Sequence, residues 1–191
     1  MAAMAPSQDI YLKTSVFSMA KNRILWLLIL MVSSSITGSI MTSYNDVLSQ
    51  VVVLASFIPM LMDTGGNCGS QSSTLIIRGL ALGELKYKDT WKILWKELRV
   101  SVMVGLALAI VFIAKSFIIP PYIELNIMLI VAISLFLTVV IAKLTGGILP
   151  IIAVRLGLDP ALMASPLITT IVDTFSLFVY FNVATRLFNI V

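Results

Sequence analysis

The chain of 191 residues has no histidine, a single cysteine (Cys68) and few charged residues, which make up 12% of the total. Without histidine there is no His-based catalytic triad or general base, and one cysteine allows neither an internal disulfide nor a Cys/His zinc site. Soluble domains carry about 25% charged residues, whereas 59% of this chain is hydrophobic and its mean hydropathy is +1.05. These deficits exclude an ordinary water-soluble fold and favour a membrane protein.

The apolar residues gather into segments long enough to cross a bilayer. A spanning helix needs about 20 largely apolar residues. Five segments qualify, the second continuing into a polar stretch: 24–43, about 47–62, 100–119, about 126–142 and 166–188. Ser165 is placed to cap the fifth helix, and Pro166 stands in its first turn. We predict an all-α membrane protein with five transmembrane helices and no enzymatic activity, preceded by a short amphipathic lead at residues 1–22.

The basic residues predict how these helices are oriented. Of the thirteen lysines and arginines, all except Lys115 and Arg186 lie before the first span, between the second and third, or between the fourth and fifth. Positive charge in short loops marks the cytoplasmic side, so the N-terminus is predicted to be cytoplasmic and the C-terminus extracytoplasmic. Within these loops, residues 84–99 are interpreted as an interfacial amphipathic turn or helix, and Lys143 is expected to reach the interface where residues 145–150 end the fourth span.

Asp173 is the most conspicuous polar residue inside an apolar span. It lies seven residues after Pro166, about 10 Å into the bilayer at 1.5 Å per residue, and no basic residue stands three or four positions away. A carboxyl group in this setting is either protonated or neutralised by a visiting cation. A functional carboxylate is therefore weighed against a protonated Asp that hydrogen-bonds a neighbouring helix.

A second polar cluster interrupts the second span at residues 63–74, where three glycines mix with Asp63, Asn67, Gln71 and several hydroxyl side chains. Irregular backbone at this depth requires burial in protein or a water-filled cavity, and Asn67 and Gln71 share one helical face. The alternative is a small-residue packing seam with hydroxyls bonded back to the backbone. Packing is also the favoured explanation for the serines and threonine of residues 33–39.

The oxygen ligands of these clusters suit hard cations such as Mg²⁺ and Ca²⁺. Mg²⁺ dehydrates reluctantly, so a site with few carboxylates fits an ion contacted through its water shell. The residues alone therefore predict a pathway for hard cations in which Asp173 is the main charge. They leave open whether the protein is a channel or a carrier.

Three segments carry a resemblance to a known family. The chain resembles the MgtE magnesium channels in the sequence PMLMDTGGNCGSQS at residues 59–72 and in LGLDPA at 156–161, followed by Ser165-Pro166 and the Asp173 segment. It is also similar to them at residues 11–13, followed by 23–38. The resemblance implies a homodimer of five-helix protomers with a Mg²⁺ pore on the two-fold axis, formed by residues 23–191. The ion would be held by Asp173, the Thr169 carbonyl and Asn67. Asp63, Gly66 and Gln71 are weaker candidates for lining the pore.

The resemblance also implies a location and partners. We expect a multi-pass protein of the bacterial inner membrane whose partners are a second copy, the bilayer and divalent cations, with no nucleic acid. The family's cytosolic N and CBS domains have no counterpart in this sequence, so we expect conduction without the usual inhibition by internal Mg²⁺. Two alternatives remain: a secondary carrier that exchanges Mg²⁺ for Na⁺ or H⁺, and a non-transporting membrane scaffold.

Overall fold

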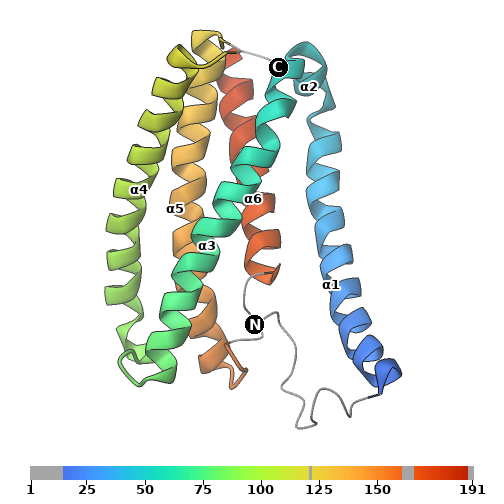
Figure 1. Cartoon of the computed structure of the whole chain (residues 1–191), viewed down its shortest axis with the longest axis vertical. Coiled ribbons are helices and arrows are strands. Elements are labelled where there is room, and N and C mark those ends of the chain that lie inside the picture. Colours follow the sequence, from blue (N-terminus) through green and yellow to red (C-terminus); the bar gives the residue numbers. More distant parts are fainter. Residues whose placement is uncertain (1–14, 121, 161–165, 189–191) are drawn as a thin grey trace.

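The computed structural model describes residues 15–120, 122–160 and 166–188, and no β-strand occurs among them (Figure 1). The all-α prediction is therefore confirmed for this part of the chain. In chain order the elements are α1 (Val16–Ser43), α2 (Asn45–Gln50), the 3₁₀ helix η2 (Val52–Phe57), α3 (Ile58–Ala81), the 3₁₀ turn η3 (Tyr87–Asp89), α4 (Thr90–Ile118), α5 (Leu125–Arg155) and α6 (Pro166–Phe188).

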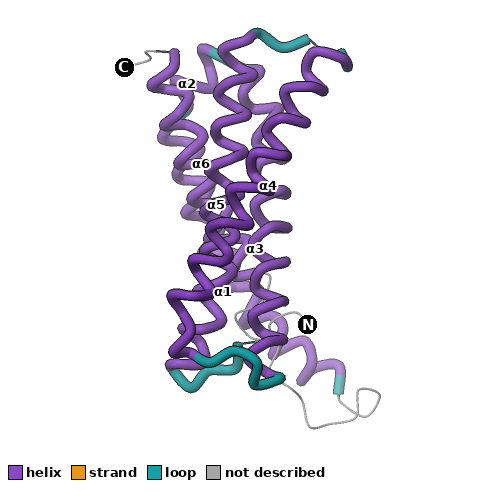
Figure 2. The backbone as a smooth tube through the Cα atoms, turned by 90° about the vertical axis from the view of Figure 1, so that its left-hand side faces the viewer, coloured by secondary structure: helices purple, strands orange, loops and turns teal. Residues whose placement is uncertain are grey.

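The long helices lie along one common axis, with the described loops gathered at the two ends (Figure 2). Helix α5 is the centre of the bundle, because it packs against α3, α4 and α6, while α3 also packs against α6. Helix α1 is peripheral and contacts mainly α6. Figure 1 shows it on the side of the molecule away from α4. The connection from α1 to α3 lies at the same end of the bundle as the connection from α4 to α5.

The outer surface of the bundle is that of a membrane protein. Three helical stretches are long and apolar enough to cross a membrane: Tyr87–Ile118, Leu125–Arg155 and Pro166–Phe188. Large apolar side chains such as Leu27, Met103 and Ile110 are exposed on α1 and α4. Contiguous apolar surface of this kind is not tolerated in water, so it faces lipid.

Three expectations about where helices begin, break and end are wrong. Residues 47–62 do not form one span, because α2 and η2 come first and α3 begins only at Ile58. The glycine-rich cluster does not interrupt the helix either; it lies inside α3, which continues to Ala81. Likewise residues 145–150 do not end the fourth span, since α5 continues through Pro150 to Arg155. In a packed membrane bundle, neighbouring helices compensate for such glycines and prolines.

The other boundaries follow the sequence more closely. Helix α6 occupies Pro166–Phe188, the residues predicted for the fifth span, and Ser165 lies outside the described residues. Helix α3 ends at Ala81 with Leu82 as its C-cap, and Gly83 follows with a φ of 71°, the left-handed conformation that glycine adopts without steric cost. The segment 84–99, predicted as an interfacial amphipathic turn or helix, contains η3 and the first turns of α4, which continues to Ile118. Its Trp91 and Trp95 are exposed in the first turns of α4.

Two contacts fix the end of the bundle that α2 and η2 cover. The Tyr180 hydroxyl of α6 donates a hydrogen bond to the Leu54 carbonyl at 2.8 Å, so η2 is bonded to the core. Tyr44, at the end of α1, stacks on Phe181 with 4.7 Å between ring centroids. These aromatic contacts join α1 and η2 to α6. Because η2 leads directly into α3, they also fix the position of α6 along α3.

Candidate ion site at the crossing of α3 and α6

The glycines of α3 bring α6 unusually close. A Cβ atom at Gly65 would lie 2.7 Å from Cγ1 of Val172, one at Gly66 would lie 2.9 Å from Cγ2 of Thr169, and one at Gly69 would lie 2.8 Å from Cγ2 of Ile168. All three distances are below ordinary van der Waals contact, so only glycine fits. The small residues therefore form a packing seam with α6, as one of the two interpretations of the cluster expected.

The polar residues of α3 lie beside that seam rather than in it. Five exposed polar side chains recur every three or four positions along the helix and so share one face. We call them the α3 polar stripe: Asp63, Asn67, Gln71, Thr74 and Arg78. The seam and the stripe coexist on different faces of one regular helix. The packing interpretation thus accounts for the glycines and leaves the amide and carboxylate groups unexplained.

The contacts between the glycines and α6 also set the register of the candidate residues. Gly69 meets Ile168 and Gly65 meets Val172, so the two helices run antiparallel past one another. Thr169 packs on Gly66, which precedes Asn67 in the chain. Because the helices are antiparallel, the turn of α6 from Thr169 to Asp173 leads the same way along the bundle as the turn of α3 from Asn67 back to Asp63. Asn67 and Thr169 therefore lie near one level of the α3–α6 crossing, and Asp63 and Asp173 lie about one turn, roughly 6 Å, further along the bundle.

Their exposure differs in a way that matters for ion binding. Asp173 and Thr169 are half-buried, Asn67, Asp63 and Gln71 are exposed, and Gly66 is buried. Within the described part of the chain the Asp173 carboxylate makes no hydrogen bond or ion pair, so the alternative of a helix–helix hydrogen bond finds no partner there. The Thr169 hydroxyl donates to the Pro166 carbonyl at 2.9 Å. Its oxygen and its own carbonyl can still accept.

The arrangement suits a hydrated cation better than a bare one. No group of three or more His, Cys, Asp or Glu side chains that could enclose a metal occurs among the described residues. A site with few carboxylates, amides and carbonyl oxygens leaves most of the coordination shell to water, which matches the reluctance of Mg²⁺ to dehydrate. What the geometry offers chemically is a partly open, oxygen-lined surface that includes the carboxylates of Asp173 and Asp63.

A buried polar group away from this surface was missed by sequence reasoning. Glu97 of α4 is 8% exposed, and Lys143 of α5 is 5% exposed, so the prediction that Lys143 reaches the interface is wrong. Between them lies Ser72 of α3, which donates to Glu97 Oε2 at 2.6 Å and stands 3.5 Å from Lys143 Nζ. Glu97 follows Ile93 by four residues and precedes Ser101 by four, so all three lie on the buried face of α4. This spacing was the signal available in the sequence.

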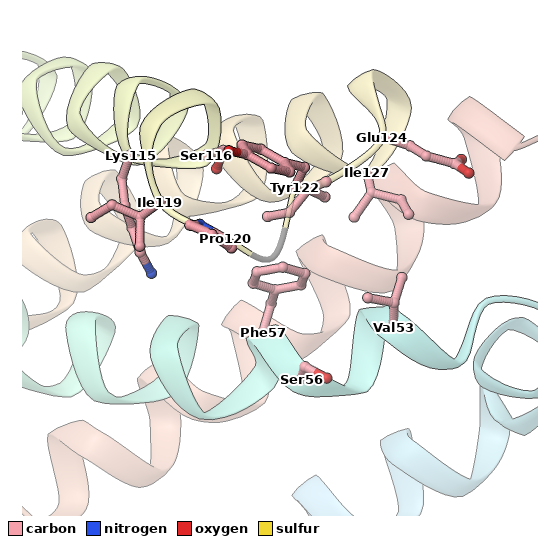
Figure 3. Close-up of a pocket in the computed structure, with 11 residues that line it drawn as sticks. Val53, Ser56, Phe57, Lys115, Ser116, Ile119, Pro120, Tyr122, Glu124 and Ile127 are labelled. Atoms are coloured by element: carbon pink, nitrogen blue, oxygen red, sulfur yellow. The ribbon is translucent and has the colours of Figure 1, made fainter.

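A pocket of about 410 Å³ opens at the end of the bundle near the α4–α5 connection (Figure 3). Apolar and aromatic side chains provide most of its lining, among them Phe57, Ile119 and Tyr122. Figure 3 shows the Glu124 carboxylate pointing away from Phe57, and the other charged group of the lining is Lys115. This lining does not suit a divalent cation, so the α3–α6 crossing remains the candidate site.

Comparison with known proteins finds a matching family model and related transporters. Residues 58–183 match the family model MgtE, described as a divalent cation transporter. The chain is 39% identical over 181 residues to the magnesium transporter MgtE of Bacillus subtilis, covering 95% of this chain and 40% of that protein. It is 39% identical over 171 residues to the Thermus thermophilus protein of the same name, covering 88% of this chain and 37% of the relative. The chain thus spans about two fifths of the length of these relatives.

Proposed function

Because the chain belongs to the MgtE family of divalent cation transporters, we propose that it forms the pathway by which Mg²⁺ crosses the membrane, with Asp173 as the main ion-binding carboxylate. The observation that carries the proposal is the α3 polar stripe beside Asp173. The exposed side chains in the middle of α4 are apolar by contrast, for example Met103 and Ile110. A stripe containing Asp63, Asn67 and Gln71 is too costly to leave in hydrocarbon. It therefore borders water or protein.

A second copy of the chain is the proposed cover for this surface. In a homodimer with the stripes and the two Asp173 side chains facing the symmetry axis, two carboxylates would attract one hydrated cation. The half-buried Asp173 has no cationic partner among the described residues, so a divalent ion supplies the missing positive charge. The Thr169 carbonyl and the Asn67 amide add neutral oxygen ligands about one helical turn away along the bundle. Mg²⁺ is thus substrate and ligand at once.

Five membrane crossings fit this proposal. In addition to the three strongly apolar helices, α1 contains the apolar stretch Leu27–Ser43 and α3 has 24 residues, enough for about 36 Å at 1.5 Å per residue. Helix α3 is less apolar because one of its faces borders the ion pathway. With successive crossings antiparallel, the basic residues at 78–99 and at Arg155 share one end of the bundle, which we assign to the cytoplasm.

The test is Mg²⁺ uptake into proteoliposomes. Asp173→Asn should reduce uptake and raise the Mg²⁺ concentration needed for half-maximal rate, because it removes the charge without changing the shape. Asp46→Asn is the matched control, since Asp46 is exposed in α2. Equal uptake by both variants and the parent chain would refute the site. Uptake that requires an opposing Na⁺ or H⁺ gradient would indicate an exchanger instead of a channel.

A further inference from the structure

The inward face of α4 contains one charged residue. The buried positions Ile93, Glu97, Ser101, Gly105 and Ala109 recur every four residues, and all the others are apolar or small. The basic residues in the same part of the helix, Lys92, Lys96 and Arg99, are exposed. A carboxylate on a buried face is unfavourable unless it is hydrogen-bonded and paired with a positive charge.

The hydrogen bond comes from α3, and the positive charge of α5 approaches Glu97 through the same hydroxyl. The Ser72 hydroxyl has one proton, and the bond to Glu97 Oε2 at 2.6 Å uses it. The oxygen of Ser72 is then left to accept from the Lys143 ammonium at 3.5 Å, a long contact that is mainly electrostatic. The result is a polarised chain from cation to hydroxyl to anion with no net charge. We call Glu97, Ser72 and Lys143 the buried triad.

The neighbouring glycines leave space for this triad. A Cβ atom at Gly147 would lie 3.3 Å from Cγ of Glu97, and one at Gly146 would collide with the backbone of Gly69. These two glycines of α5 let α4 bring its carboxylate, and α3 its backbone, close to the central helix. Ser72 lies nine residues before the end of α3 at Ala81, about 14 Å along the axis. The triad is therefore inside the bundle and not at its mouth.

The triad connects α4 to α3, two helices that otherwise pack mainly on α5 and not on each other. Apolar side chains tolerate small rotations of a helix, whereas a hydroxyl held between an anion and a cation is satisfied in one orientation. Ser72 directly follows Gln71 of the α3 polar stripe, so the rotation that fixes Ser72 also fixes the stripe about 100° away. The position of the stripe depends on the triad.

We propose that Glu97, Ser72 and Lys143 are positioning residues of the ion pathway, which fix the rotation of α3 so that Asn67 and Gln71 face the permeating ion. This inference rests on the proposed function, because it concerns how that pathway is held in shape. None of the three residues contacts the ion. Their effect on transport is exerted through α3, and so it should appear as a change in apparent Mg²⁺ affinity and selectivity.

The first experiment compares Glu97→Gln, Lys143→Met and the double variant in the full chain. Each single change leaves one buried charge without its counterpart, while the double variant is neutral and nearly unchanged in shape. We expect each single variant to raise the KM for Mg²⁺ uptake about tenfold, the factor that corresponds to about 1.4 kcal/mol. The double variant should return the KM most of the way to the value of the parent chain. A role confined to folding would lower the maximum rate with the amount of active protein and leave KM unchanged.

The second experiment isolates the hydroxyl. Ser72→Ala removes it without adding volume, and Ser72→Thr retains it. We expect Ser72→Ala to raise KM and to weaken discrimination of Mg²⁺ from Ca²⁺, with Ser72→Thr closer to the parent chain. Should Ser72→Thr fail to fold for lack of space, Ser72→Cys against Ser72→Ala provides the same comparison. Lys115→Met and Glu124→Gln are the controls, because both side chains are exposed at the opposite end of α4 and α5.

The outcomes separate this inference from the function on which it rests. If the parent chain takes up Mg²⁺, and the effects of Glu97→Gln and Lys143→Met simply multiply in the double variant or leave KM unchanged, the positioning role is refuted and the proposed function stands. If the parent chain takes up no Mg²⁺, the proposed function is refuted and the positioning role falls with it. In either case thermal unfolding of the four proteins reports whether Glu97 and Lys143 are energetically coupled.

Discussion

The side-chain oxygen of Thr37 on α1 lies 3.1 Å from that of Thr174 on α6, within hydrogen-bond distance. Thr174 has one hydroxyl proton and gives it to the Thr170 carbonyl at 2.9 Å, so its oxygen can only accept from Thr37. Thr37 is 8% exposed on a helix whose other side chains are largely exposed. This hydrogen bond therefore sets the height of α1 against α6, one residue after Asp173.

Thr37→Val should weaken this attachment, because it replaces the donor by a methyl group of similar size. Interhelical hydrogen bonds in membrane proteins contribute about 0.6 kcal/mol on average, so we expect a loss of stability of that order in detergent unfolding. Thr42→Val is the control, since Thr42 is exposed and its hydroxyl bonds to the Ser39 carbonyl of its own helix. Equal losses in the two variants would mean that the Thr37–Thr174 contact does not attach α1.

Gly146→Ala should be among the most destabilising single methyl additions in the chain. The added Cβ would meet the Gly69 backbone, which cannot move aside as a side chain can. Overpacking of this kind costs about 1–3 kcal/mol, and we expect the upper end of that range in thermal unfolding. Gly38→Ala is the matched change, because nothing lies within 4 Å of its Cβ. It should be neutral or stabilising, since alanine favours a helix by about 1 kcal/mol over glycine.

The same glycines show where sequence reasoning succeeded and where it failed. The α6 helix was predicted to the residue, because Pro166 and the change in polarity mark its start. The glycine cluster of α3 was expected to interrupt its helix, because glycine disfavours helices locally. That expectation was wrong because the glycines, which have no side chain, let Val172, Thr169 and Ile168 of α6 pack closely against α3. The stabilisation from this packing outweighs the low helix propensity of glycine. Such packing involves residues far apart in the chain.

The buried triad was missed for a related reason. Glu97 stands among Lys92, Lys96 and Arg99, so the segment has the composition of an exposed, interfacial helix. Its burial depends on space that Gly147 of another helix provides, which no local pattern contains. Asp173 and Asn67, by contrast, could be singled out from the sequence because each is polar in an apolar background. That they come from two antiparallel helices in close contact, about one helical turn apart along the bundle, required the structure.

Gly66→Ala should impair both packing and transport, and Thr169→Ser should rescue it. The alanine Cβ would lie 2.9 Å from Cγ2 of Thr169, which pushes α6 away from α3 next to Asn67. Serine lacks that methyl group but keeps the hydroxyl and the carbonyl. We therefore expect Gly66→Ala to lose Mg²⁺ uptake and the double variant to regain it in the proteoliposome assay. Thr169→Ser alone should behave like the parent chain. If the double variant is no better than Gly66→Ala, the contact between Gly66 and Thr169 does not set the spacing of α3 and α6.

Water should reach the α3 polar stripe but not the exposed face of α4, and cysteine labelling distinguishes the two. The native Cys68 is buried, so a Cys68→Ala background leaves single cysteines introduced by Asn67→Cys, Gln71→Cys, Leu106→Cys or Ile110→Cys as the reporters. All four positions are exposed on the single chain.

Bringing a charge into the bilayer centre costs about 2.5–3.5 kcal/mol, which corresponds to roughly a hundredfold slower reaction with a charged thiol reagent. We expect rapid labelling at positions 67 and 71 in lipid vesicles, slowed by added Mg²⁺, and labelling about a hundredfold slower at positions 106 and 110. Equal rates on α3 and α4, or protection by Mg²⁺ at neither helix, would show that the polar stripe packs against protein and does not line an aqueous pathway.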